Sequence, residues 1–175
     1  LCTLQYDMMF DPEWPTIAAE DQGKLMMIAS TADGDEGTTG GNKADGYNGF
    51  SIRTQGMTES GGKIPMCLYV YHVDQPDDFG EKFPWFIPGG GMVRGTWYRV
   101  RIEVKINDPT KADGEIAVFV DGMQAYRKSN FRFRLSATAL PGIERVIPKI
   151  YWGGSAVPAV DAAVHVKNLS VRWAL

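Results

Sequence analysis

Two tyrosines separated by one residue, Tyr69 and Tyr71, offer the clearest chemistry in this sequence. They lie in the run Cys67-Leu68-Tyr69-Val70-Tyr71-His72, whose composition is typical of a β-strand. Residues i and i+2 of a strand point to the same face, so both phenols should project together while Leu68 and Val70 face a core. A phenol beside a cation can exchange a proton with a substrate, and the pair is therefore a candidate acid–base group.

An earlier segment, Phe50-Ser51-Ile52-Arg53, alternates in the same way, with Ser51 and Arg53 on its polar face. If both strands belong to one curved sheet, a hydroxyl, a guanidinium and two phenols would line one cleft. Such a set is suited to an acidic sugar, because a guanidinium pairs with a carboxylate and a phenol can move a proton.

The elements that must position these side chains are strands, and strand-like segments run through the whole chain. The segment around Tyr98–Ile106 shows the clearest period of two. Asp113-Gly114 and Asp121-Gly122 predict turns on either side of one strand, and hence an antiparallel meander, while Lys167-Asn168 predicts a break or bulge. The expected strands are Leu4–Phe10, Lys24–Ala29, Gly49–Thr54, Met66–His72, Thr96–Ile106, Gly114–Val120, Met123–Arg127, Val146–Trp152 and Ala163–Trp173.

Many strands, no convincing helical stripe and long connections at Thr31–Asn48 and Asp74–Gly95 predict an all-β fold. We expect a β-jelly roll, that is, a two-sheet antiparallel sandwich with a concave substrate cleft. The 175 residues contain no evident linker or repeat, so we expect a single domain over residues 1–175.

Composition excludes several classes of protein. The chain is 44% hydrophobic and 22% charged, and no apolar run approaches the roughly 20 residues that a membrane span requires. The net charge of −3 argues against a nucleic-acid binder, although a cleft on an acidic protein can be locally positive. We therefore expect no membrane or nucleic-acid partner, and a monomer.

Metal sites and disulfides have little support. The two cysteines, Cys2 and Cys67, could form a disulfide or stay as thiols, and their spacing favours neither. The two histidines have no zinc-ligand spacing, and His165 belongs to no motif. We expect no cofactor; a structural calcium ion at the turn residues Asp113 and Asp121 is conceivable, but nothing in the sequence supports it.

Other catalytic templates fit poorly. The run Gly89–Gly95 lacks the Gly-Lys-Ser/Thr ending of a phosphate loop, and no Gly-x-Ser-x-Gly elbow occurs. Four carboxylates in one loop could supply a glycosidase pair, but their turn-rich setting favours a solvated surface. These are Asp74, Asp77, Asp78 and Glu81.

An ordered set of short motifs covers nearly the whole chain and resembles the polysaccharide lyase family 14 alginate lyases, and more distantly the family 20 glucuronan lyases. The motifs are Gln22-Gly23-Lys24-Leu25, Gly49-Phe50-Ser51-Ile52-Arg53, Tyr69-Val70-Tyr71-His72, Phe79-Gly80-Glu81, Gly95-Thr96-Trp97-Tyr98-Arg99-Val100, Ala112-Asp113-Gly114, Val120-Asp121-Gly122 and Tyr151-Trp152-Gly153-Gly154.

The resemblance implies a jelly roll that cleaves polyuronates by β-elimination, alginate (polymannuronate) first and glucuronan second. Carried over position by position, it puts five residues at catalytic positions, and it alone singles out the lysine among them. We expect a secreted protein, with any signal peptide absent from this chain. The catalytic candidates are Lys24, Ser51, Arg53, Tyr69 and Tyr71, and the substrate-binding candidates are Arg53, Lys24, His72 and Gln55, although strand parity puts His72 on the core side.

The chemistry can also be argued from the residues. Elimination removes the C5 proton beside a carboxylate and expels the O4-linked sugar, so the enzyme must neutralise that carboxylate. Arg53 and Lys24 are suited to this task. A free tyrosine has a pKa near 10, and nearby cations would favour its phenolate, which could then take the proton. The alternative is a lectin-like sugar-binding module without catalysis, which would need aromatic platforms but no base beside a cation.

Overall fold

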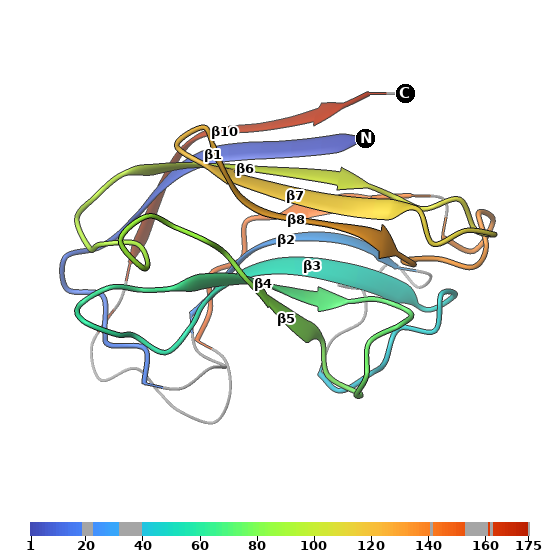
Figure 1. Cartoon of the computed structure of the whole chain (residues 1–175), viewed down its shortest axis with the longest axis horizontal. Helices are drawn as coiled ribbons and strands as arrows, with labels where there is room; N and C mark the ends of the chain where they lie inside the picture. Colours follow the sequence, from blue (N-terminus) through green and yellow to red (C-terminus); the bar gives the residue numbers. More distant parts are fainter. Residues whose placement is uncertain (19–22, 32–39, 141, 153–160, 162, 175) are drawn as a thin grey trace.

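The computed structural model describes residues 1–18, 23–31, 40–140, 142–152, 161 and 163–174, and in these the fold is all-β. Two antiparallel sheets of five strands, called sheet A and sheet B, lie one above the other. The two chain ends lie side by side at one edge of sheet A (Figure 1). The described residues contain no helix, and so no helix that could span a membrane.

Each sheet combines strands from both ends of the sequence, and the predicted two-sheet antiparallel sandwich is confirmed. Sheet A has the order β10 (Val164–Trp173), β1 (Cys2–Phe10), β6 (Tyr98–Lys105), β7 (Gly114–Val120) and β8 (Met123–Phe131). Sheet B has the order β5 (Glu81–Pro84), β4 (Met66–Tyr71), β3 (Gly49–Gly56), β2 (Lys24–Thr31) and β9 (Arg145–Ile147).

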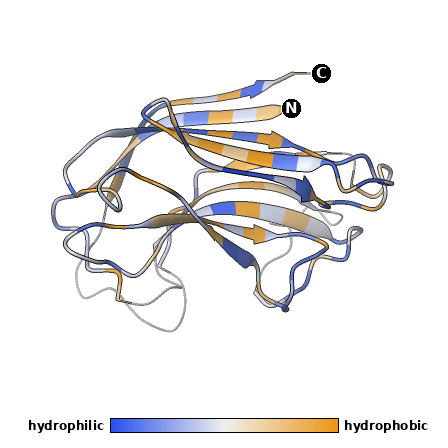
Figure 2. Cartoon of the chain, in the orientation of Figure 1, coloured by the Kyte–Doolittle hydropathy of each residue, from blue (hydrophilic) through white to orange (hydrophobic). Residues whose placement is uncertain are grey.

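The main core lies between the two sheets and takes alternate residues from each strand. Val100, Ile102 and Val104 of β6 enter it, as do Leu68 and Val70 of β4. Figure 2 shows this alternation as a change of colour along the strands. The outer face of sheet B is also buried along β3 and β4, and β2 and β3 arch so that this face is concave (Figure 1).

The predicted meander and bulge are both present. Strands β6, β7 and β8 pair in sequence, and Asp121 and Gly122 turn β7 into β8 with φ values of 50° and 83°. A two-residue hairpin turn of type I′ needs two such left-handed residues, which explains the Asp-Gly pair. The ladder between β1 and β10 shifts register beside Asn168, whose amide donates to Asp7 Oδ2 at 2.7 Å.

Three strand predictions were incomplete, and one of them is Met123–Arg127, since β8 continues to Phe131. Strand β5 was missed, because its four residues end in a proline and are too short to show a period. The expected strand Val146–Trp152 is observed only as β9, after which Pro148 interrupts the ladder. A single bridge between Tyr151 and Lys24 resumes the pairing with β2.

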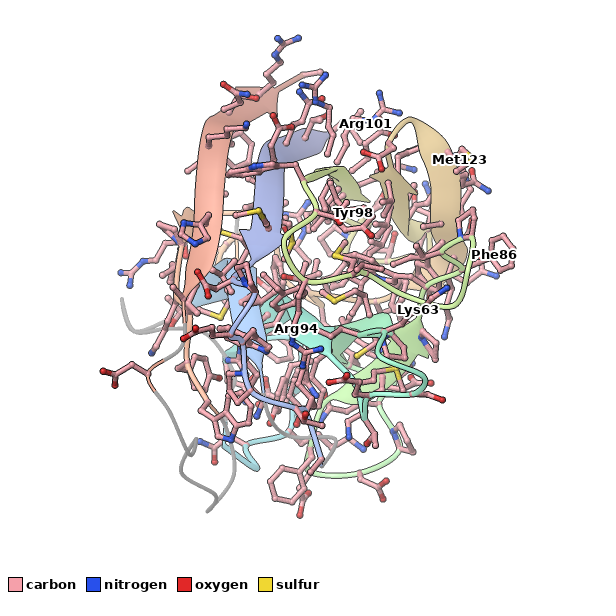
Figure 3. All side chains as sticks on the ribbon, turned by 90° about the vertical axis from the view of Figure 1, so that its left-hand side faces the viewer. Lys63, Phe86, Arg94, Tyr98, Arg101 and Met123 are labelled. Carbon is pink, nitrogen blue, oxygen red and sulfur yellow. The ribbon has the colours of Figure 1, made fainter. Side chains whose placement is uncertain are left out.

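Loops at one end of the sandwich meet around Arg94, which Figure 3 shows among them. Its guanidinium donates to the carbonyl oxygen of Trp14 at 2.6 Å and to Glu59 Oε1 at 2.9 Å. The guanidinium also holds the pKa of Glu59 below its usual range. This half-buried ion pair ties three chain segments together.

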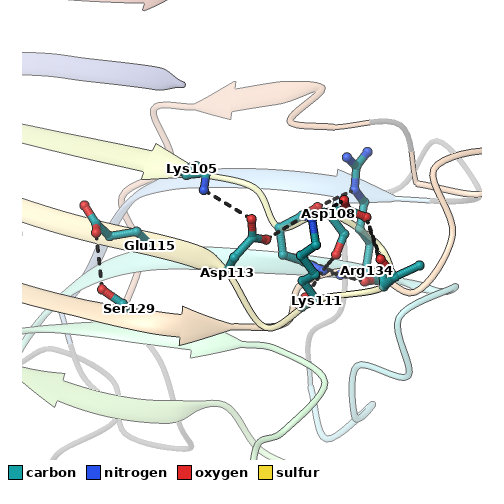
Figure 4. Close-up of polar contacts among 9 residues, drawn as sticks. Lys105, Asp108, Lys111, Asp113, Glu115, Ser129 and Arg134 are labelled. Carbon is teal, nitrogen blue, oxygen red and sulfur yellow. Dashed lines mark hydrogen bonds and ion pairs between the residues drawn. The ribbon is translucent and has the colours of Figure 1, made fainter.

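The loop between β6 and β7 is fixed by polar contacts, including those of Asp113 with Lys105 and of Asp108 with Lys111 (Figure 4). The fully buried Asn107 is its centre: its Nδ2 donates to the carbonyl oxygens of Asp108, Lys111 and Arg134. Its Oδ1 accepts from the backbone N–H groups of Phe133 and Arg134. Next along the chain, the N–H of Leu135 donates to the carbonyl oxygen of Gly46 at 2.9 Å, so this network supports the segment 40–48.

Substitution of Asn107 by alanine should lower the free energy of unfolding by about 3 kcal/mol, because one buried and four partly buried hydrogen bonds to the backbone are lost. Thr110→Ala, at an exposed position in the same loop, is the matched control and should change stability by no more than about 0.5 kcal/mol. Urea denaturation of both variants measures the difference. Equal stabilities would contradict the role given to Asn107.

Candidate active site

Tyr69 and Tyr71 lie together on the outer face of sheet B, as their spacing predicted. Their rings meet edge to face with centroids 5.5 Å apart, and their hydroxyl oxygens are 3.3 Å apart. With Ala44 they form a small cluster separate from the main core. One hydroxyl can therefore donate to the other, and a proton can pass between them.

Backbone amides point at both phenol oxygens. The N–H of Gly80 donates to Tyr69 Oη at 3.2 Å, and the N–H of Gly41 donates to Tyr71 Oη at 3.4 Å. Donors of this kind stabilise negative charge on an oxygen. A Cβ atom at Gly80 would lie 2.9 Å from Cδ2 of Tyr71, so glycine permits this close approach.

Two cations flank the tyrosine pair. Lys24 Nζ lies 5.2 Å from the ring centroid of Tyr69, and Arg53 Cζ lies 5.6 Å from that of Tyr71. The ladder between β3 and β4 sets Arg53 opposite Tyr69 and Ser51 opposite Tyr71. Arg53 is only 3% exposed, and its Nε donates to Met27 Sδ at 3.0 Å. The five catalytic candidates thus come from three adjacent strands and share one face.

Gln55 also shares this face, one step further along β3. It pairs with Lys24 of β2 on one side and with Cys67 of β4 on the other. Gln55 and Ser51 are both fully buried, so the roles given to them stay predictions. Cys67 and Cys2 are buried, lie in different sheets and form no disulfide with each other.

His72 is not brought to the tyrosine face. Its ring packs edge to face on Phe131 of sheet A, with centroids 5.2 Å apart, and its Nε2 lies 2.9 Å from Glu81 Oε2. Burial lowers the pKa of His72, which favours its neutral form. The core side predicted from strand parity is correct. Because the side chain points into the core, away from the phenols of Tyr69 and Tyr71, we leave His72 out of the proposed site.

A pocket of about 710 Å³ opens beside Tyr69. Its wall is the segment after β4, including the exposed ring of Phe79, and the first half of β5. Lys82 of β5 lines it and is the ladder partner of Tyr69, so both side chains leave the same face. Sequence reasoning missed Lys82 because it missed β5.

Carboxylates around this pocket do not form a metal cluster. Asp77 and Asp78 are exposed, and Asp74 is paired with Arg132 outside the pocket. In the described part of the chain, no three His, Cys, Asp or Glu side chains could together hold a metal ion. The turn residues Asp113 and Asp121 instead accept backbone N–H groups, those of Asp108 and Arg99.

The geometry therefore provides a coupled acid–base pair with a cation beside each ring. Two backbone N–H groups are aimed at the oxygens that would carry charge. A carboxylate bound by Arg53 and Lys24 would lie within reach of the phenols, and a proton on the neighbouring carbon could then be removed.

Residues 1–158 match the family described as Polysaccharide lyase 14. The solved structure of alginate lyase Aly36B is 25% identical, with a TM-score of 0.79 over 98% of this chain and 69% of that one. Mutants of Aly36B have been solved with an alginate trisaccharide and an alginate tetrasaccharide. A search of curated proteins found no match.

Two further alginate lyases share the fold at lower identity. The marine enzyme from Aplysia kurodai is 21% identical, with a TM-score of 0.70 over 98% of this chain and 69% of that one. The Chlorella virus enzyme vAL-1 is 16% identical, with a TM-score of 0.67 over 98% of this chain and 70% of that one. The fold is thus that of jelly-roll alginate lyases.

Proposed function

The chain belongs to polysaccharide lyase family 14, and we propose that residues 1–175 form one catalytic domain that cleaves alginate by β-elimination. Polymannuronate is the expected preferred substrate and glucuronan the second. The observation that carries the proposal is the hydroxyl pair of Tyr69 and Tyr71 with the cations of Lys24 and Arg53 beside its rings.

In the proposed reaction, Arg53 and Lys24 bind the carboxylate of the uronate whose C5 proton is removed. Neutralising that carboxylate makes the proton more acidic and stabilises the enolate-like intermediate. One tyrosine, as phenolate, takes the C5 proton. The C4–O bond then breaks, and the phenol of the pair protonates the leaving oxygen.

Alginate oligosaccharides bound to the Aly36B mutants support an acidic polysaccharide as the substrate. A lectin-like module would need sugar-stacking rings but not a buried guanidinium and an ammonium beside two hydrogen-bonded phenols. Secretion and a monomeric state fit an extracellular polymer as substrate and are part of the proposal.

The test is incubation of the purified chain with polymannuronate, polyguluronate, mixed alginate and glucuronan. Elimination leaves a C4–C5 double bond conjugated with the carboxylate, which absorbs in the ultraviolet. We expect absorbance to rise fastest with polymannuronate. No rise with any of the four polymers would refute the proposed function, and a faster rise with glucuronan would reverse the substrate order.

A further inference from the structure

Tyr151 is locked to Lys24 through the backbone. The N–H of Lys24 donates to the carbonyl oxygen of Tyr151 at 3.0 Å, and the N–H of Tyr151 donates to that of Lys24 at 2.9 Å. Directly paired residues of an antiparallel bridge project their side chains to the same side. The side chain of the next residue, Trp152, projects to the opposite side, where its ring packs on the core residue Trp14 with ring centroids 5.8 Å apart. The ring of Tyr151 is thereby directed to the tyrosine face.

The ammonium of Lys24 contacts two rings. Its Nζ lies 5.2 Å from the ring centroid of Tyr69 and 5.8 Å from that of Tyr151. Both distances are within the about 6 Å at which a cation is attracted to an aromatic face. A lysine side chain is long and flexible, and each ring that it lies over favours one position of its charge. The ring of Tyr151 thus adds to the attraction that keeps the ammonium beside Tyr69.

We propose that Tyr151 is a positioning residue for the reaction, because its ring holds the Lys24 ammonium beside the Tyr69 phenol. There the charge can both favour the phenolate and meet the substrate carboxylate. This inference rests on the proposed function, since it needs a tyrosine that loses its proton. It assigns a role to Tyr151, the first residue of the Tyr-Trp pair that follows β9.

The pH dependence of the site has other contributors. The charged or titratable groups that face Tyr69 from its neighbouring elements are Lys24, Arg53, Tyr71, Asp77, Asp78, Glu81 and Lys82. Two ammonium groups lie over the ring of Tyr151, that of Lys149 at 5.4 Å and that of Lys24 at 5.8 Å from its centroid, and Lys24 is the one that also lies over the ring of Tyr69. A change at Tyr151 should therefore act on the tyrosine pair through Lys24.

Tyr151→Leu should lower kcat/KM on polymannuronate about tenfold, the value of roughly one cation–π contact. It should also move the rising limb of the pH–rate profile to higher pH, because the phenolate loses its fixed cation. Tyr151→Phe keeps the ring and should recover most of both losses. A purely structural role of Tyr151 would lower the amount of folded enzyme but leave that limb in place.

The control is Trp97→Leu, which removes a cation–π pair from the outer face of sheet A, where Lys167 Nζ lies 3.8 Å from the ring of Trp97. It should leave the pH profile in place. A double-mutant cycle with Lys24→Met tests whether Tyr151 acts through Lys24. In the Lys24→Met background, Tyr151→Leu should cause no further loss of kcat/KM. Tyr151→Gln replaces Tyr151→Leu in this cycle if the leucine variant does not fold.

Three results would overturn the inference while the wild-type enzyme stays active. The first is a pH–rate profile whose rising limb stays in place in both Tyr151→Leu and Tyr151→Gln. The second is a Tyr151→Phe variant as impaired as Tyr151→Leu. The third is losses of kcat/KM that add in the double mutant of Tyr151 and Lys24. An inactive wild-type chain would instead refute the proposed function itself.

Discussion

Tyr69→Phe and Tyr71→Phe should each lower turnover about 10²–10⁴-fold, the usual contribution of a general acid or base. Each change removes one oxygen and leaves the edge-to-face contact of the two rings in place. Because the hydroxyls form one unit, the double mutant should be little worse than the more impaired single mutant. Initial rates on polymannuronate and thermal melts measure both effects.

Tyr126→Phe is the matched control. Its hydroxyl is buried in sheet A and has no hydrogen-bond partner among the described residues, and burial raises its pKa. This variant should keep wild-type turnover. Near-wild-type turnover in both Tyr69→Phe and Tyr71→Phe would contradict the proposed base.

The pH profile distinguishes this base from a histidine. A phenolate base should give activity that rises on the alkaline side of neutral, since a free tyrosine ionises near pH 10. Burial lowers the pKa of His72, so a His72-dependent rate would already be flat above about pH 6.5. A flat profile abolished by His72→Ala, with both tyrosine variants active, would transfer the base role to His72.

Arg53→Ala should lower kcat about 10²–10³-fold and raise KM, because the guanidinium is proposed to bind the carboxylate in both the ground state and the transition state. Arg53→Lys should recover only part of the loss, since an ammonium cannot bind a carboxylate bidentately. Steady-state kinetics of the two variants, corrected for folded fraction, measure the split between kcat and KM.

Arg101→Ala is the control for these variants. Arg101 lies over Phe119 on the outer face of sheet A, 4.1 Å from the ring centroid, and its loss should leave both constants near wild type. Full recovery of kcat and KM by Arg53→Lys would show that only a positive charge is needed. Unchanged kinetics of Arg53→Ala would remove it from the site.

What the sequence predicted well was local. The period of two in Met66–Tyr71 assigned both tyrosines to one face and Leu68 and Val70 to the core, as the structure has them. The Asp-Gly turns predicted the meander of β6, β7 and β8, because a turn is determined by a few consecutive residues. Such patterns are sufficient for the fold class and for the central strands of the site.

What the sequence could not show depends on register between distant strands. Lys82 reaches the tyrosine face through a strand of four residues ending in proline, which has no readable period. Tyr151 reaches Lys24 through one bridge across more than a hundred residues of sequence, so no local pattern announces it. Lys24 itself was singled out by the resemblance alone. Pairing of this kind is fixed by tertiary packing.

The most direct test of the account is to run the wild-type reaction on polymannuronate in heavy-oxygen water and weigh the products. β-Elimination consumes no water, so we expect new non-reducing ends that are unsaturated and lighter by one water than those of hydrolysis. The new reducing ends, weighed before their anomeric hydroxyls exchange with water, should be free of heavy oxygen. The Tyr69→Phe/Tyr71→Phe double mutant should give almost none of this product. Saturated non-reducing ends, together with heavy oxygen on C1 of the new reducing ends, would contradict elimination, and bound but uncut polymer would identify a binding module.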